Sequence, residues 1–293
     1  MKNHIFQKEF FNIEKKSTPA ILIIIAGLFF FISMIIYPLI STKKTTASSN
    51  KIKTIINKSL QVTNQAIFLD DTIELCRFVP VVGGDVQSCR TNYTPKLIND
   101  SIYYIPNYDY KTIHLKSFLM TDIPVTHNLY NYVMSNMRPN SKDMYDQHTP
   151  IQWNEFIKTL CEITGRTFRL PTDAEWEYAA KGGNKQHGYI YSGSNDINEV
   201  ANYGETNPSI PFVFARKKMP NELGLYDMSG SVWELTSDIN EYVYCYYPDN
   251  SKYHPLIARG GCLFSKAEQC AISAPFYSCN DQTMVGVRLV LEY

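Results

Sequence analysis

The 293-residue chain has no excess of charge of either sign, because 28 lysines and arginines stand against 28 aspartates and glutamates. A protein that holds nucleic acid through a basic surface needs an excess of positive charge, so nucleic acid is excluded as the main partner. Glycine is ordinary at 14 residues and no segment repeats, which excludes collagen-like and repeat proteins. With 44% hydrophobic and 19% charged residues, the chain has enough apolar material for a globular core.

The seven cysteines lack the spacing of a metal site. None forms a Cys-x-x-Cys pair, and the six histidines are scattered, so a structural zinc site is not expected. The short separations between Cys76 and Cys89 and between Cys270 and Cys279 favour two disulfides, one of several connectivities, and disulfides persist in an oxidising compartment. An odd number leaves at least one thiol over. Cys161, on the apolar face of its helix, is the expected buried free thiol.

One long apolar run stands near the N-terminus. Residues 17–42 contain no ionisable side chain except Tyr37. A helix of about 20 apolar residues crosses roughly 30 Å of hydrocarbon, so the run predicts an uncleaved transmembrane anchor. A buried core helix would be shorter and amphipathic. A cleavable signal peptide is disfavoured by the long segment before the run and by the poor cleavage site around Ala47.

The apolar run divides the chain into four predicted parts. These are a cytoplasmic N-terminus at 1–16, the anchor at 17–42, a polar stalk at 43–71 and a folded domain at 72–293. Lysines flank the run on both sides, so the positive-inside rule does not orient it. The expected disulfides do, because they favour a domain outside the cytosol. The chain is therefore predicted to be a single-pass protein of the inner (cell) membrane, with its C-terminal domain periplasmic or otherwise extracytoplasmic.

Local patterns predict several short elements within the folded domain. Residues 78–86 have the composition of a strand, a turn at Gly83-Gly84 and a second strand, and 103–105 and 113–119 also have strand composition. Apolar residues recur at helical spacing over 154–163. Thr172 with Glu175 three residues later forms a capping box, which predicts the start of a helix that ends at Gly182-Gly183.

Four sequence blocks carry a resemblance to a known family. They are RLPTDAEWEYAAKGG (169–183), PNELGLYDMSGSVWELTSD (220–238), ARGG (258–261) and VGVRL (285–289). In this order they resemble the formylglycine-generating enzyme family, also called the sulfatase-modifying-factor domain, over about 72–293. The resemblance implies an irregular α+β fold of the C-type-lectin type with low secondary-structure content. Because this scaffold carries oxidases, iron enzymes and binding modules, its function depends on the residues of the site.

The resemblance also implies where an oxidase would keep its copper-binding cysteines. In the oxidase members they stand four and nine positions after the last glycine of the RGG motif, which here gives Ser265 and Cys270. The first cysteine is therefore missing. Cys262 directly follows Gly261, and in an extended segment this odd offset would turn its side chain to the other face. No catalytic residue is expected, although a sulfatase-maturing or related oxidase using Cys270 with Cys262 and copper remains the alternative. Relatives that mature siderophore chromophores without this pair leave a different oxidation open.

Calcium is the second cofactor that the resemblance implies. Family members often hold calcium through an asparagine before the long loop and through a GNVWEW segment, which correspond here to Asn202, Ser231 and Glu234. Serine replaces the usual asparagine and removes a good carbonyl ligand, so at most one weakened site is expected.

Large buried side chains are expected to build the core around these motifs. Trp176 and Trp233 should fill it. Arg169 and Arg288 should pair with buried acids such as Glu175 or Glu177.

Tyrosine is the last informative feature, with 21 residues. One cluster lies at 103–110, and a second at 241–250 precedes the RGG motif and contains Tyr242, Tyr244, Tyr246 and Tyr247. Tyrosine gives rigid contact area with a polar tip, although half of these residues could equally pack inward. The second cluster is predicted to bind a protein or peptide partner in the envelope. The expected protein is an accessory or regulatory part of an envelope assembly such as a secretion apparatus.

Overall fold

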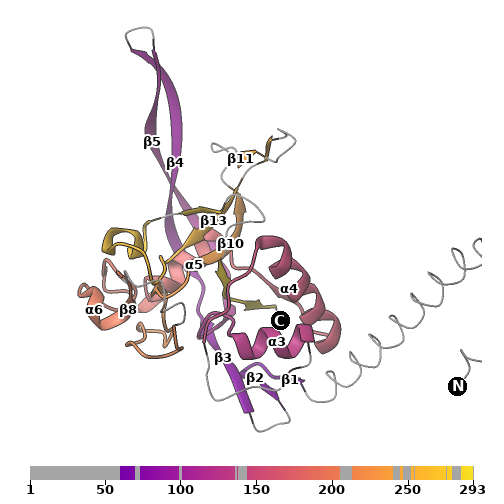
Figure 1. Cartoon of the computed structure of the whole chain (residues 1–293). Coiled ribbons are helices and arrows are strands. Elements are labelled where there is room, and N and C mark those ends of the chain that lie inside the picture. The colour runs from indigo at the N-terminus through magenta and orange to yellow at the C-terminus, as the bar shows by residue number, and fades with distance from the viewer. Residues whose placement is uncertain are drawn as a thin grey trace, which may run out of the picture. The chain divides into compact units, whose positions relative to one another are not determined.

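The computed structural model describes residues 60–69, 73–98, 101–135, 137, 144–204, 213–239, 245–246, 252–253, 255–274, 276–278 and 285–292. Residues 56–293 form one compact unit. Short helices and small sheets make up this unit (Figure 1), so the predicted mixed α/β fold with little helix is confirmed. The predicted N-terminus at 1–16 and anchor at 17–42 lie outside the described residues. Within the described ranges, no helix is both long and apolar enough to cross a membrane.

The larger sheet has six strands, and each pairs antiparallel with its neighbours. In spatial order they are β1 (Leu60–Val62), β2 (Ala66–Leu69), β3 (Ile73–Val81), β6 (Phe118–Thr121), β16 (Val290–Leu291) and β7 (Phe168–Arg169). The C-terminal strand β16 thus lies inside the sheet, between β6 and the edge strand β7. Chain segments far apart in sequence therefore meet in this sheet.

The first two strands correct the predicted stalk. Residues 60–69 were expected to be a polar linker, yet Leu60, Ile67 and Leu69 are buried in the core. Their apolar side chains alternate on a short hairpin that extends the sheet edge beyond β3. The folded domain therefore begins before residue 72.

Two helices cover the core beside this sheet. They are α3 (His127–Ser135) and α4 (Pro150–Thr164), which lie side by side (Figure 1). The predicted apolar stripe of α4 is confirmed, because Phe156, Leu160 and Ile163 are buried. Gly165 ends α4 in a left-handed conformation, which glycine adopts at little cost.

The predicted capping box at the start of α5 (Asp173–Ala180) is present. The Thr172 hydroxyl accepts a hydrogen bond from the Glu175 amide at 3.1 Å, and the Glu175 carboxylate accepts one from the Thr172 amide at 2.8 Å. Two backbone donors that a helix start leaves unpaired are thereby satisfied. The helix ends at Ala180, close to the predicted stop at Gly182-Gly183, and the 3₁₀ turn η1 (Gly183–Lys185) follows.

A second sheet contains parts of the sequence motifs of the C-terminal half. Its strands are β14 (Phe276–Ser278), β13 (Leu256–Arg259), β10 (Glu234–Ile239) and β15 (Gly286–Val287), and β15 runs parallel to β10. Smaller elements are α6 (Ile197–Val200), the 3₁₀ turn η2 (Ala267–Cys270), and the pairs β8 (Ala201–Asn202) with β9 (Ser229–Gly230) and β11 (Cys245–Tyr246) with β12 (Lys252–Tyr253). These pieces hold the loops of the candidate site.

A long two-stranded hairpin leaves the body of the domain. Its strands, β4 (Gly84–Ile98) and β5 (Ser101–Leu115), pair antiparallel over their full length and project beyond the other elements (Figure 1). The predicted turn at Gly83-Gly84 is confirmed, but the strands on either side of it do not pair with each other. Instead β3 joins the large sheet and β4 forms the hairpin with β5. A Cβ at Gly83 would come within 2.3 Å of the Leu115 carbonyl oxygen, so only glycine fits this crossing.

Removing the cap of α5 should lower stability by a measurable amount. We expect Thr172→Ala to reduce the free energy of unfolding of the full chain by about 1 kcal/mol, because the Glu175 amide loses its acceptor. Urea unfolding followed by circular dichroism would measure this. Thr172→Ser keeps the hydroxyl and should stay close to wild type. Equal losses in both variants would contradict the capping role.

Candidate functional site

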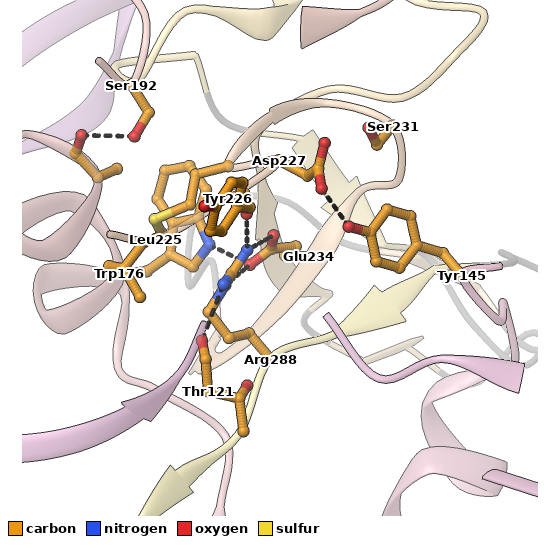
Figure 2. A network of polar contacts seen from close by, with 12 residues as sticks. Thr121, Tyr145, Trp176, Ser192, Leu225, Tyr226, Asp227, Ser231, Glu234 and Arg288 are labelled. Atoms are coloured by element: carbon orange, nitrogen blue, oxygen red, sulfur yellow. Dashed lines mark hydrogen bonds and ion pairs between the residues drawn. The ribbon is translucent and has the colours of Figure 1, made fainter. Parts of the chain in front are cut away.

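A fully buried ion pair lies at the centre of the domain (Figure 2). Glu234 begins β10 and Arg288 lies between β15 and β16, and both side chains are fully buried. Arg288 donates to the two carboxylate oxygens of Glu234, from Nε at 2.9 Å and from Nη2 at 2.8 Å. Trp176 Nε1, from α5, donates to Glu234 Oε2 at 2.7 Å. Arg288 also donates to the backbone carbonyls of Thr121 at 2.8 Å and Tyr226 at 2.7 Å, so every guanidinium nitrogen has a partner.

The two arginines that were expected to pair with buried acids have different partners. Arg169 pairs with Glu175 at 2.7 and 2.8 Å, as predicted. The partner of Arg288 is Glu234, not Glu175 or Glu177. The two residues are 54 positions apart, a separation that no local pattern encodes.

Both tryptophans of the motifs contact the core. Trp176 is fully buried, as predicted, and Trp233 is partly buried and packs against the core residues.

The three residues of the predicted calcium site do not form one set of ligands. The negative charge of Glu234 is neutralised by Arg288, and both of its oxygens already accept hydrogen bonds. Asn202 and Ser231 do lie together, with Asn202 Nδ2 donating to Ser231 Oγ at 3.3 Å and the Ser231 amide donating to the Asn202 carbonyl at 2.8 Å. Calcium favours several oxygen ligands that include carboxylates, which Asn202 and Ser231 alone do not supply. Calcium binding stays a prediction, without a ligand from Glu234.

A second buried polar group was not foreseen from the sequence. Asp227 is 2% exposed and accepts a hydrogen bond from the Tyr145 hydroxyl (Figure 2). It also accepts one from the Arg216 amide at 2.9 Å. Burial raises the pKa of the Asp227 carboxyl, and burial together with the neighbouring Asp227 raises the pKa of Tyr145 well above its ordinary value. The Arg216 guanidinium pairs with the buried Asp122 at 2.7 Å, so this group fastens the loop before β9 to the end of β6.

Two histidines lie beside one carboxylate, although their spacing in the sequence did not indicate that they would be close together. His127 Nδ1 lies 3.3 Å and His148 Nε2 lies 3.1 Å from Asp146 Oδ2. Tyr130 stacks on the His148 ring with centroids 3.7 Å apart. Within the described ranges no group of three acidic, histidine or cysteine side chains could hold a metal ion. This group brings α3 and the segment before α4 together through close polar contacts and ring stacking.

The RGG motif ends β13 and turns the chain sharply. Arg259 pairs with Asp173 at 2.6 Å, which fastens β13 to the first turn of α5. Gly260 and Gly261 have φ angles of +93° and +79°, a region that favours glycine. A Cβ at Gly261 would come within 2.6 Å of the Cys270 sulfur. The glycines therefore allow the turn to press directly on Cys270.

Cys270 lies in the core. It is fully buried, and burial first, with the nearby Cys262 second, raises the pKa of its thiol to about 12. At neutral pH Cys270 is thus protonated. Its thiol is free, so the structure shows no bridge to Cys279, which lies outside the described residues.

Cys262 lies beside Ser265, contrary to the expectation from an extended segment. Residues 262–265 form a tight turn in which the Ser265 amide donates to the Cys262 carbonyl at 2.9 Å. The Cys262 amide donates to Ser265 Oγ at 2.9 Å, and the Cys262 sulfur lies 3.4 Å from the same oxygen. The turn brings the two side chains to one side. A half-exposed thiol thus stands next to the position of the missing oxidase cysteine.

These residues do not fit a copper site. Cuprous copper requires soft thiolate ligands. Ser265 offers a hydroxyl where a thiolate is needed, and Cys270 is fully buried with the pKa of its thiol raised to about 12. The alternative oxidase would have to rely on Cys262 and this buried partner.

The remaining predicted site residues lie partly outside the described residues. Cys161 is a free thiol as expected, but it is half-buried, and the Phe168 amide donates to its sulfur at 3.2 Å. The side chain of Cys89 lies outside the described part, so its bridge to Cys76 stays a prediction. Tyr246 belongs to the short strand β11, where only its backbone is described, and Tyr242, Tyr244 and Tyr247 lie outside the described residues.

Comparison with known proteins identifies the family. Residues 14–293 match the model of the sulfatase-modifying factor enzyme 1-like domain. The chain belongs to this family. The predicted resemblance is therefore confirmed. The match also begins well before the predicted domain boundary at 72.

The matched relatives differ in the share of their own length that aligns with this chain. A chaperone protein, LppX of Paenibacillus barcinonensis, is 29% identical over 245 residues, covering 67% of this chain and 82% of that protein. The formylglycine-generating enzyme of Thermomonospora curvata is 32% identical over 103 residues, which span 30% of this chain and only 32% of the enzyme. The solved structure of Treponema denticola variable protein 1 superposes with a TM-score of 0.54 at 22% identity, covering 74% of this chain and 95% of that one. The last comparison supports the fold alone.

Breaking the central ion pair should destabilise the domain strongly. Arg288→Met would leave the Glu234 carboxylate buried without a counter-charge, and we expect a loss of about 3–5 kcal/mol in the free energy of unfolding. Urea unfolding of the full chain would measure it. Arg169→Met removes a partly exposed ion pair and should cost no more than about 1 kcal/mol. Similar losses in the two variants would show that the central pair does not dominate.

The two cysteines of the site should differ in reactivity. Alkylation of the folded chain with iodoacetamide at pH 8, read by peptide mass spectrometry, should label Cys262 and spare Cys270, because a thiol with a pKa of about 12 is almost entirely protonated there and is buried. In urea both should react. Equal labelling of both in the folded chain at pH 8 would refute the structural role of Cys270.

Proposed function

We propose that this chain is an extracytoplasmic accessory protein, anchored in the membrane by residues 17–42, whose sulfatase-modifying-factor domain binds a protein or peptide partner without oxidase chemistry. One observation carries the proposal: Ser265 occupies the position of the first oxidase cysteine, while Cys270 is buried with the pKa of its thiol raised to about 12. The serine at position 265 leaves the family's pair of thiol ligands one short. What remains is a surface for binding.

The similarity to LppX supports the accessory role. That relative is named a chaperone, and the alignment covers 82% of it, against 32% of the Thermomonospora enzyme. A polypeptide client in the cell envelope is therefore the partner class that we favour. The tyrosines of the 241–250 segment are the proposed contact residues, since they precede β13 and the RGG turn in the chain. A place in an assembly such as a secretion apparatus fits this role.

Site-specific photo-crosslinking tests the partner proposal. A photoreactive phenylalanine analogue would replace Tyr244 in the full chain, expressed in its native cells, and adducts would be identified by mass spectrometry. We expect one recurrent polypeptide adduct. The same analogue at Ile151, which is 58% exposed on α4, serves as the control and should not give it. Adducts that are absent, or the same from both positions, would contradict binding at the tyrosine-rich segment.

Copper binding and conversion of a peptide cysteine test the alternative oxidase function. The thiol of Cys262 beside Ser265 is the observation that favours it. Titration of the reduced full chain with cuprous copper against a competing chelator should show no tight one-to-one site if the chain is an accessory protein. Tight binding lost in both Cys262→Ser and Cys270→Ser, together with conversion of a cysteine in a sulfatase-derived peptide, would establish the oxidase instead.

A further inference from the structure

The Asp227 carboxylate closes the loop of residues 216–227 at its neck. Arg216 and Asp227 are eleven positions apart at the two ends of this loop, and the Arg216 amide donates to Asp227 Oδ2 at 2.9 Å. The Tyr145 hydroxyl donates to the same oxygen, which ties the neck to the segment before α4 (Figure 2). The side chains of Asp227 and Tyr145 and the amide of Arg216 are here called the Asp227 latch.

Both ends of the loop have an unfavourable backbone conformation. The φ angle is +58° at Arg216 and +59° at Asp227, in the left-handed region that residues other than glycine seldom adopt. Such a conformation persists only where surrounding contacts hold it. Within the loop, the Asn221 side chain donates to the Ala179 carbonyl at the end of α5 at 2.8 Å, which holds the middle of the loop. At the neck, the hydrogen bond of the latch joins the two strained residues directly.

The carboxylate of the latch is buried without a counter-charge of its own. Asp227 is buried and forms no ion pair among the described residues, and its Oδ1 accepts no hydrogen bond there. The charge of Arg288 attracts it, but Arg288 is bonded to Glu234, whose own negative charge repels it. The Arg216 guanidinium is bonded to Asp122. A buried carboxylate in this situation is disfavoured in its charged form.

Opening the neck would return this carboxylate to water. Burial raises the pKa of Asp227 in the closed loop, whereas an open loop would leave it near the ordinary value for aspartate. The closed state therefore binds the proton more tightly. Acid favours closure, and this contribution is lost as the pH rises through the raised pKa. Tyr145 stays protonated throughout, because its own pKa is raised well above the ordinary value for tyrosine.

We propose that the Asp227 latch is a pH-sensitive element, which holds the neck of the 216–227 loop closed in mild acid and loosens it toward neutral and alkaline pH. The loop leads directly into β9 and from there to Ser231, beside Asn202. Loosening its neck would therefore change the backbone that enters the candidate site. The latch would respond to pH whether or not the chain binds a polypeptide partner.

Hydrogen exchange of the loop amides measures the latch directly. The purified full chain, in a mild non-ionic detergent, would be exchanged with deuterium from about pH 4.5 to about pH 8, a range that begins close to the ordinary pKa of aspartate. Peptides would be read by mass spectrometry, with rates corrected for the intrinsic pH dependence of exchange. We expect the protection of residues 214–219 to fall at least about threefold across this range, since each unit of pKa difference changes the opening equilibrium about tenfold. The protection of α4 should not change.

Three variants separate the latch from other titrating groups. Asp227→Asn keeps an oxygen acceptor and tolerates the left-handed φ, but it cannot titrate, so the change of protection with pH should disappear. Tyr145→Phe removes a hydrogen bond that stabilises the charged carboxylate, so the change should move to higher pH. Asp196→Asn, at an exposed helix cap that asparagine also satisfies, is the matched control and should keep the wild-type profile.

Several outcomes would overturn the latch. These are a wild-type protection of 214–219 that is constant or rises with pH, a change that persists in Asp227→Asn, and an equal loss of protection in α4, which would indicate unfolding of the whole domain. The unfolding temperature verifies that Asp227→Asn folds. If it does not fold, Tyr145→Phe decides, because a shift to lower pH or no shift would contradict the role of the carboxylate.

Discussion

The fold depends on one buried ion pair that must be satisfied on every side. Removing a guanidinium and a carboxylate from water is costly, and the cost is offset only where each polar atom gains a well-placed partner. Arg288 meets this condition through both oxygens of Glu234 and the carbonyls of Thr121 and Tyr226. These partners come from β10, β6 and the loop before β9. Because Trp176 bonds to the same carboxylate, α5 is fixed to this centre as well.

The geometry of the candidate site depends on the same ion pair between Arg288 and Glu234. β13 pairs with β10 next to Glu234, and Arg259 at its end binds Asp173 at the start of α5. The glycine turn that follows presses on Cys270 and leaves Cys262 at the surface beside Ser265. Thiol chemistry depends on exposure and on access to the thiolate. The same packing that stabilises the domain therefore makes one cysteine structural and leaves the other accessible.

The hairpin of β4 and β5 follows a different principle from the core. Its root is held by Val86 and Leu115, but the rest of its length extends past the body, where local pairing and residue alternation decide its faces. The pairing of β4 with β5 continues from Gly84 opposite Leu115 to Ile98 opposite Ser101. The domain thus combines a closely packed interior with a projecting two-stranded element (Figure 1).

The sequence by itself determined the elements whose signals are local. The capping box of Thr172 and Glu175, the apolar stripe of α4 and the pairing of Arg169 with Glu175 follow from residues within one or two helical turns, and the family followed from contiguous motifs. Only the tertiary structure decided that Arg288 pairs with Glu234, that Tyr145 binds Asp227 82 residues away, and that residues 60–69 extend the sheet. It also turned Cys262 toward Ser265, where an extended segment would have pointed it away. Local hydrogen bonds and side-chain periodicity are fixed by neighbours in the chain, whereas a buried charge takes whichever partner the packing of distant strands brings within reach.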